Sequence, residues 1–216
     1  MNFLTLCKTL ARESGASSST LTTVSGATGE NLRFIEWVRQ ANRDVQSLWA
    51  NWKFNFAQAS DTTSVGVSVN SAPSDLESWD RLRFKIDGEA VPSIDYAEWS
   101  DFGAVSIGKP SMVVVMPDNG LMFSPTPDDI YAVTGDYYKR PQDLTDNEDI
   151  PRIPETYHDV IWLYALVNYA YYEAADEVLQ RAKDRLMERL PRLEASQLPM
   201  AHNHAWSNPG FVVEVS

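Results

Sequence analysis

Apolar residues recur at helical spacing in the N-terminal part of the chain. In residues 30–52 they return every three or four positions, which predicts an amphipathic helix with Thr28 as its N-cap. Residues 2–14 show the same spacing, and Gly15 is suited to end that shorter helix. Residues 16–29 are rich in Ser, Thr and Gly and are expected to form a loop.

From Lys53 onwards the pattern changes to an alternation of apolar and polar residues, which is typical of strands. Short strands at such close spacing favour an antiparallel meander, either a small sandwich or a partly open barrel. One helical turn is expected within residues 95–102. The predicted strands are Phe54–Phe56, Val65–Val69, Leu82–Ile86, Met112–Met116, Leu121–Phe123 and Ile130–Lys139, with turns at Asp87–Gly88 and Pro117–Gly120.

Helical patterns return after an acidic connector, residues 141–151. Pro154 suits the first position of a helix predicted for residues 155–174, which is apolar nearly all round and should be buried or face an interface. A second helix, residues 175–194, carries one apolar stripe and a charged face. The chain ends in a strand-like apolar tail, Phe211–Val215.

These elements predict an α+β protein. Its helical bundle combines the N- and C-terminal helices, an antiparallel β-rich segment is inserted between them, and an extended tail follows. We expect residues 1–53 and 151–195 to form the helical unit, residues 54–150 the acidic insertion, and residues 196–216 the tail.

The charge of the chain is concentrated in its middle. The formal net charge is −12, and residues 54–160 hold 19 acidic and 7 basic side chains, whereas the rest of the chain holds 11 of each. A protein that binds phosphate groups is expected to carry a basic patch instead. The densest acidic positions are Asp128, Asp129, Asp143, Asp146, Glu148 and Asp149; without the spacing and central Gly of a calcium loop they indicate a solvated acidic surface rather than a cation site.

The sequence contains no motif for a catalytic or cofactor site. Phosphate-binding loops, dinucleotide fingerprints, nucleophile elbows, zinc-protease motifs and paired CxxC motifs are all missing. His202 and His204 lie close together, but a metal site needs three or four ligands. His158 is expected to be a hydrogen-bonded core or cap residue. The sequence therefore predicts no catalytic residue, no cofactor and no metal.

Three further features restrict the cellular setting and the partners. Cys7 is the only cysteine, lies among apolar residues and fits burial in a protein of a reducing compartment. The most apolar run, residues 160–172, is too short to span a bilayer, so no membrane contact is expected. Trp79, Trp99 and Trp206 lie outside the predicted helices and are candidates for interfaces.

Short motifs distributed along residues 1–199 resemble head-to-tail adaptor proteins of short-tailed bacteriophages. Their order and spacing carry the resemblance, whereas residues 60–76, residues 90–110 and the tail are less typical. The motifs are Met1–Leu4, Arg12–Gly15, Val24–Glu30, Ala41–Gln46, Trp79–Arg81, Gly135–Pro141, Asp149–Pro154, Tyr157–His158, Glu173–Ala175 and Leu198–Pro199.

The resemblance implies a structural protein of the virion neck that is made in the host cytoplasm. Such adaptors form a ring, usually of twelve copies, beneath the dodecameric portal protein. The ring extends the DNA channel and offers a docking surface to the tail or nozzle protein that follows. Genomic DNA passes through without specific binding. The resemblance implies no activity and no cofactor.

The implied role and the distribution of charged and apolar residues together suggest two hypotheses about surfaces. Part of segment 54–160 would line the channel, since like charge keeps DNA from adhering. The tail residues Trp206, Phe211, Val212, Val213 and Val215 would contact the portal, in part by adding a strand to its sheet edge. Two other functions remain open: another ring protein of the neck or tail tube, and a tail-associated carbohydrate-active enzyme with a perturbed carboxylate in an acidic cleft.

Overall fold

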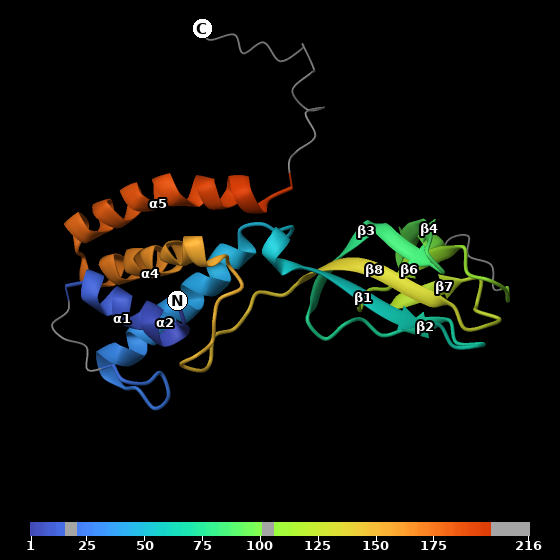
Figure 1. The fold of residues 1–216 in the computed structure, drawn as a ribbon, viewed down its shortest axis with the longest axis horizontal. Coiled ribbons are helices and arrows are strands. Elements are labelled where there is room, and N and C mark those ends of the chain that lie inside the picture. Colours follow the sequence, from blue (N-terminus) through green and yellow to red (C-terminus); the bar gives the residue numbers. More distant parts are fainter. Residues whose placement is uncertain (16–20, 101–105, 200–216) are drawn as a thin grey trace, which may run out of the picture.

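The computed structural model describes residues 1–15, 21–100 and 106–199. The molecule is elongated, with helices at one end and strands at the other (Figure 1). This arrangement confirms the predicted α+β class, in which helices from both ends of the chain flank a β-rich insertion. The helices are α1 (Phe3–Glu13), α2 (Gly29–Ser47), α3 (Tyr96–Ser100), α4 (His158–Glu173) and α5 (Asp176–Gln197), with 3-10 turns at Lys53–Asn55 and Glu155–Tyr157.

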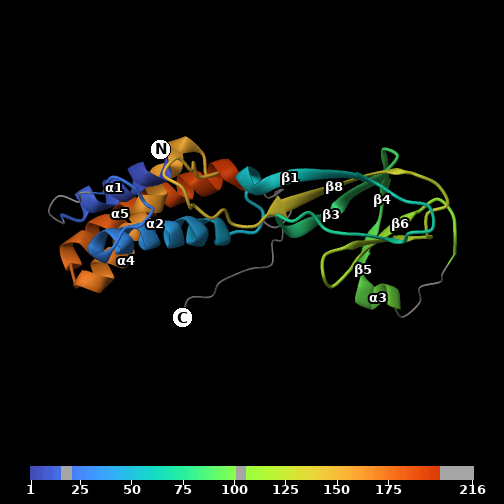
Figure 2. The same cartoon turned by 90° about the horizontal axis from the view of Figure 1, so that it is seen from below.

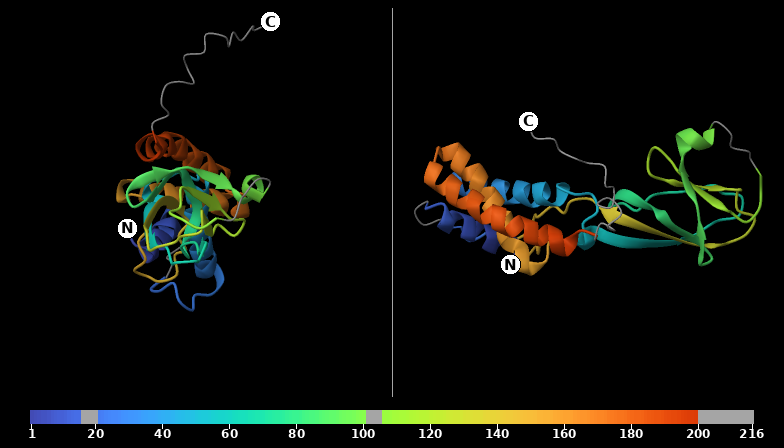
Figure 3. Two further views of the ribbon diagram at one scale, coloured as in Figure 1. Left: turned by 90° about the vertical axis from the view of Figure 1, so that its right-hand side faces the viewer. Right: turned by 90° about the horizontal axis from the view of Figure 1, so that it is seen from above.

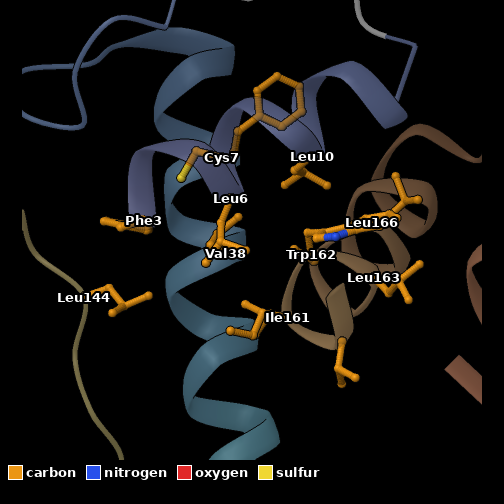
Figure 4. Close-up of a cluster of buried hydrophobic side chains, with 14 of the residues drawn as sticks. Phe3, Leu6, Cys7, Leu10, Val38, Leu144, Ile161, Trp162, Leu163 and Leu166 are labelled. Carbon is orange, nitrogen blue, oxygen red and sulfur yellow. The ribbon is translucent and has the colours of Figure 1, made fainter. Parts of the chain in front are cut away.

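We call α1, α2, α4, α5 and the segment 140–153 the helical lobe. Its central element is α4, which packs against α1, α2 and α5. This position explains why α4 is apolar nearly all round, because three of its sides meet other helices. Figure 4 shows Phe3, Leu6, Val38 and Ile161 gathered in one core between α1, α2 and α4.

The segment 140–153 leaves the last strand and returns to the helical lobe. Leu144 and Ile153 are fully buried in the helical core. The backbone N–H of Phe3 donates to the carbonyl of Asp149 at 2.8 Å, and that of Leu4 donates to the carbonyl of Asn147 at 3.2 Å. The acidic connector is therefore part of the helical packing.

Helix α2 ends at Ser47, so the prediction that it continues to Trp52 was wrong. The chain turns back and buries Trp52 against the end of the helix, where its indole Nε1 donates to the carbonyl of Val45 at 3.2 Å. Phe54 stacks on Trp52 and lies in a 3-10 turn rather than in a strand. An apolar side chain that folds back onto the end of a helix can keep the helical spacing in the sequence, although the helix itself has already ended.

The strands form two four-stranded sheets that pack face to face around a second core, and we call residues 56–139 the β lobe. Sheet order is β1-β8-β3-β4 in one and β2-β7-β6-β5 in the other (Figure 2). The strands are β1 (Phe56–Thr62), β2 (Val69–Asn70), β3 (Leu76–Ile86), β4 (Glu89–Val91), β5 (Ser93–Asp95), β6 (Met112–Val115), β7 (Leu121–Ser124) and β8 (Ala132–Lys139).

A small sandwich was one of the two predicted forms, but its strands do not follow the predicted antiparallel meander. The first and last strands, β1 and β8, pair with each other, and β5 pairs with β6 in parallel. Both ends of the insertion start from the helical lobe, so β1 and β8 leave it side by side and can pair, as the views from below and above show (Figures 2 and 3). Local alternation of side chains contains no information about this long-range pairing.

Local turn chemistry was predicted more accurately than strand extent. Asp87 and Gly88 adopt positive φ angles of 50° and 82° in the hairpin between β3 and β4. Val65 and Val67, predicted in a strand, instead lie exposed in a loop that turns at Gly66, whose N–H bonds to the carbonyl of Pro127. The expected helical turn is α3, and Phe102 of that prediction lies outside the described residues.

Trp79 is a core residue, so its selection as an interface candidate was wrong. It lies on β3, is 8% exposed and packs against Phe84 and Tyr137. Its indole Nε1 donates to the carbonyl of Asn119 at 2.8 Å. The sequence placed Trp79 outside the predicted strand Leu82–Ile86 and gave no sign that β3 starts at Leu76 or that a second sheet covers it.

Candidate interaction surfaces

The acidic residues selected from the sequence lie in two separate places. Asp128 and Asp129 precede β8 at the end of the β lobe where β1 finishes, away from the helical lobe. The hydroxyl of Tyr131 donates to Asp128 at 2.6 Å, and the N–H of Ile130 donates to Asp129 at 2.8 Å. Both carboxylates therefore support a turn while facing solvent.

The other four acidic residues lie in segment 140–153, and two of them bond to residues at the N-terminus and in α2. Arg43 donates to Asp143 at 2.5 Å, and Asn2 donates to Glu148 at 2.9 Å. Asp149 accepts the backbone N–H groups of Asp146 and Thr145 at 2.8 and 2.6 Å, and these bonds lower its pKa. Asp146 is exposed in the same loop. The structure thus does not bring the two acidic groups together.

The tail residues selected as portal contacts, Trp206 and Phe211–Val215, lie outside the described residues, as do His202 and His204. The described chain ends beside the junction of the two lobes. Lys53 donates from Nζ to the carbonyl of Ser196 at 3.3 Å, and the indole of Trp49 donates to Glu194 at 3.0 Å. The tail therefore starts close to the first strand of the β lobe.

An apolar groove of about 400 Å³ runs between α4 and α5, and the sequence reasoning missed it. Met187, which is 68% exposed, lies beside the predicted apolar stripe of α5 and was not among the residues assigned to that stripe. A single Met within a charged run was the only sign in the sequence that this groove exists. The groove is lined by Tyr164, Val167, Lys183, Leu186, Met187, Leu190 and Pro191.

An aromatic patch lies where the start of α2 meets the end of α4. Trp37 contacts Phe34, Tyr169 and Tyr172 with ring centroids 5.6–5.9 Å apart. The guanidinium of Arg33 lies 4.5 Å from the centroid of Tyr172, and Tyr172 is more than half exposed. Aromatic residues and Arg are enriched at protein interfaces, so this patch and the groove are the strongest candidates for interaction surfaces on the helical lobe.

The titratable groups show local pairing rather than an acid–base pair. Lys139 lowers the pKa of Asp75, and Arg81 lowers that of Asp95, each through a hydrogen bond. A general acid in a glycosidase needs a raised carboxyl pKa, and among the described residues every shifted carboxyl is shifted downward. Burial raises the pKa of Cys7 to about 12, so its thiol is not ionised at neutral pH.

The remaining candidates for chemistry have structural roles. His158 is buried, which lowers its pKa, and its Nε2 lies 2.8 Å from the carbonyl of Ile153. Within residues 1–15, 21–100 and 106–199, no group of three or more His, Cys, Asp or Glu side chains is placed to hold a metal ion. None of the helices in these ranges has the length and apolar character needed to cross a membrane.

Residues 1–210 match the family described as SU10 adaptor protein. No curated protein matches the chain. The family match includes both lobes and extends into the tail.

Proposed function

Because the chain belongs to the SU10 adaptor protein family, whose members are phage head-to-tail adaptors, we propose that it forms a ring of twelve copies below the portal protein of a virion. The ring extends the DNA channel, and the tail or nozzle protein docks on it. The match over residues 1–210 is the observation that carries this proposal.

The helical lobe is proposed to supply the contacts between neighbouring copies. A closed ring needs two different, complementary surfaces on each subunit. The α4–α5 groove and the aromatic patch lie on this lobe and expose apolar and aromatic side chains. Residues 1–53 and 140–216, which include this lobe, hold 17 acidic and 13 basic side chains, a smaller surplus of negative charge than the 13 and 5 of residues 54–139, so copies repel one another less through this lobe.

The β lobe is proposed to face the channel or the tail. Residues 54–139 hold 13 acidic and 5 basic side chains, and like charge weakens adhesion of passing DNA. Asp128 and Asp129 lie at the end of this lobe, whereas Asp143, Asp146, Glu148 and Asp149 belong to the helical lobe. We therefore propose two domains whose boundary on the return of the chain lies near Lys139 rather than at residue 150, because Leu144 is in the helical core.

The tail is proposed to bind the portal. Removing residues 197–216 keeps every buried residue of both cores and takes away one partly buried side chain of the helical core, Leu198. This deletion is expected to abolish binding to the portal protein of the same phage. Glu148→Ala is the control that keeps the tail and should bind as the unmodified chain does. Co-sedimentation with purified portal rings measures both variants. Unchanged binding after the deletion would remove the tail from the proposal.

A further inference from the structure

Strand β1 is a long sheet edge: one side pairs with β8, and no strand of the described residues pairs with the other side. The other three edges of the two sheets, β4, β2 and β5, have only 3, 2 and 3 residues, whereas β1 has 7. Its register with β8 runs without a bulge from Phe56 to Thr62, and it contains no Pro, Lys or Arg. Proteins usually shorten or interrupt such edges, because they readily accept another strand. Among the described residues, no strand covers this edge.

The backbone groups available on this edge follow from the position of Thr62. Its N–H donates to the side chain of Asp61 at 2.8 Å, and its carbonyl accepts from the side chain of Asn70 at 3.1 Å, so Thr62 faces away from β8. Facing alternates along an antiparallel strand, so Gln58 and Ser60 face the same way. Their N–H and C=O groups form a row that a further strand can bond.

A cavity of about 290 Å³ opens between the two sheets beside the same edge. The residues that β1 turns toward the core are small, Ala57 and Ala59, and the opposite strand β2 has only two residues. The walls include the large rings of Trp79, Phe123 and Tyr137. A strand added to β1 would therefore direct every second side chain toward an apolar cavity that has room for it.

We propose that the segment Phe211–Val215 of the same chain occupies this edge in the free protein. The described chain ends at the correct place, since Ser196 contacts Lys53, three residues before β1. Residues 198–210 can span about 43 Å when extended, whereas β1 is about 23 Å long. In the segment, Phe211, Val213 and Val215 alternate with Val212 and Glu214, so one face is wholly apolar and suits the cavity.

The contact between the tail and β1 is inferred from the structure and the sequence alone. Its consequence for the virion rests on the proposed function. The same segment is proposed to bind the portal, so pairing with β1 would keep the apolar tail covered until the portal offers a competing site. The free protein would then not present an unpaired apolar strand, which is an aggregation hazard.

Amide hydrogen exchange of the free full-length protein tests the proposal. We expect the amides of Gln58 and Ser60 to exchange roughly tenfold faster in the double variant Phe211→Asp/Val213→Asp and in a chain that ends at Gln197. The control Val212→Asp places its charge on the solvent face of the added strand and should exchange like the unmodified chain. The amides of α2 lie far from this edge, so equal exchange rates there in all variants would show that the helical lobe is unchanged.

Two results would overturn the proposal. Equal exchange of Gln58 and Ser60 in all variants would show that the tail does not cover β1. Protection that is lost on hundredfold dilution would assign the strand to a second copy instead of the same chain. Because no portal is present in this assay, a negative result leaves the portal proposal untouched, and failure of portal binding leaves the exchange result valid.

Discussion

Replacing Asp149 separates a structural role of the acidic connector from a role in the channel. Its carboxylate accepts backbone N–H groups from Thr145 at 2.6 Å and Asp146 at 2.8 Å, and the hydroxyl of Thr145 lies at 3.2 Å. Its own carbonyl accepts the N–H of Phe3 at the start of α1. The loop therefore fixes one end of a core helix.

The expected loss of stability follows from these bonds. A hydrogen bond to a charged group contributes about 1.5–3 kcal/mol when well shielded, but water replaces part of it at this half-exposed site. Asp149→Ala should therefore lower the free energy of unfolding by about 1–2 kcal/mol, and Asp149→Asn, which keeps one acceptor oxygen, by about half as much. Glu148→Ala in the same loop should change the free energy of unfolding by less than about 0.5 kcal/mol.

The pH dependence provides a second check. The backbone bonds lower the pKa of Asp149 below its ordinary value of 3.8, so the carboxylate stabilises the folded state above that pH. The difference in free energy of unfolding between the unmodified chain and Asp149→Asn should be constant near neutral pH. It should disappear as the pH falls through the folded-state pKa of Asp149. Urea unfolding followed by circular dichroism at 222 nm measures both effects. A change below about 0.3 kcal/mol for Asp149→Ala at pH 7 would refute the structural role.

Two core substitutions test the division into two lobes. Leu144→Ala should destabilise the helical lobe by about 3 kcal/mol, because Leu144 is fully buried there, whereas Leu82→Ala, at a side chain 91% exposed, should change stability by less than about 0.5 kcal/mol. Gly135→Ala should destabilise the β lobe by about 1–3 kcal/mol, because the added Cβ would lie 2.7 Å from Phe84. Gly108→Ala, with its nearest atom at 4.0 Å, is the control. Urea unfolding measures the change in stability, and amide hydrogen exchange shows which lobe is affected. If a substitution and its control had equal effects, the core packing described for that lobe would be contradicted.

The helices could be predicted well from sequence because their signal is local. Spacing of three and four residues located α1, α2, α4 and α5. The apolar character of α4 indicated that it is buried or faces an interface, and the structure places it at the centre of the helical lobe. The end of α2 was missed because Trp52 packs on the helix from a following turn and keeps the same spacing. Only the contact of its indole with Val45 distinguishes the two cases.

The strand pairing could not be predicted because it depends on the whole insertion. Asp87–Gly88 determines its own turn through positive φ angles, so that hairpin was found. The pairing of β1 with β8 joins residues far apart in sequence, and no alternation encodes it. Val65 and Val67 alternate like strand residues, yet their loop turns at Gly66.

The candidate surfaces show the same limit. The sequence located negative charge correctly but could not tell that Asp143 pairs with Arg43 while Asp128 faces solvent at the other end of the molecule. The α4–α5 groove and the cavity beside β1 each combine residues from separate elements. Such surfaces appear only when the packing is known.

The mass of the protein in solution, free and then mixed with the portal protein of the same phage, tests the central proposal most directly. Native mass spectrometry resolves the number of bound copies. An assembly that adds twelve copies to one portal ring, and that the chain lacking residues 197–216 does not form, is the predicted result. A chain that leaves the mass of the portal ring unchanged would contradict its proposed place in the virion.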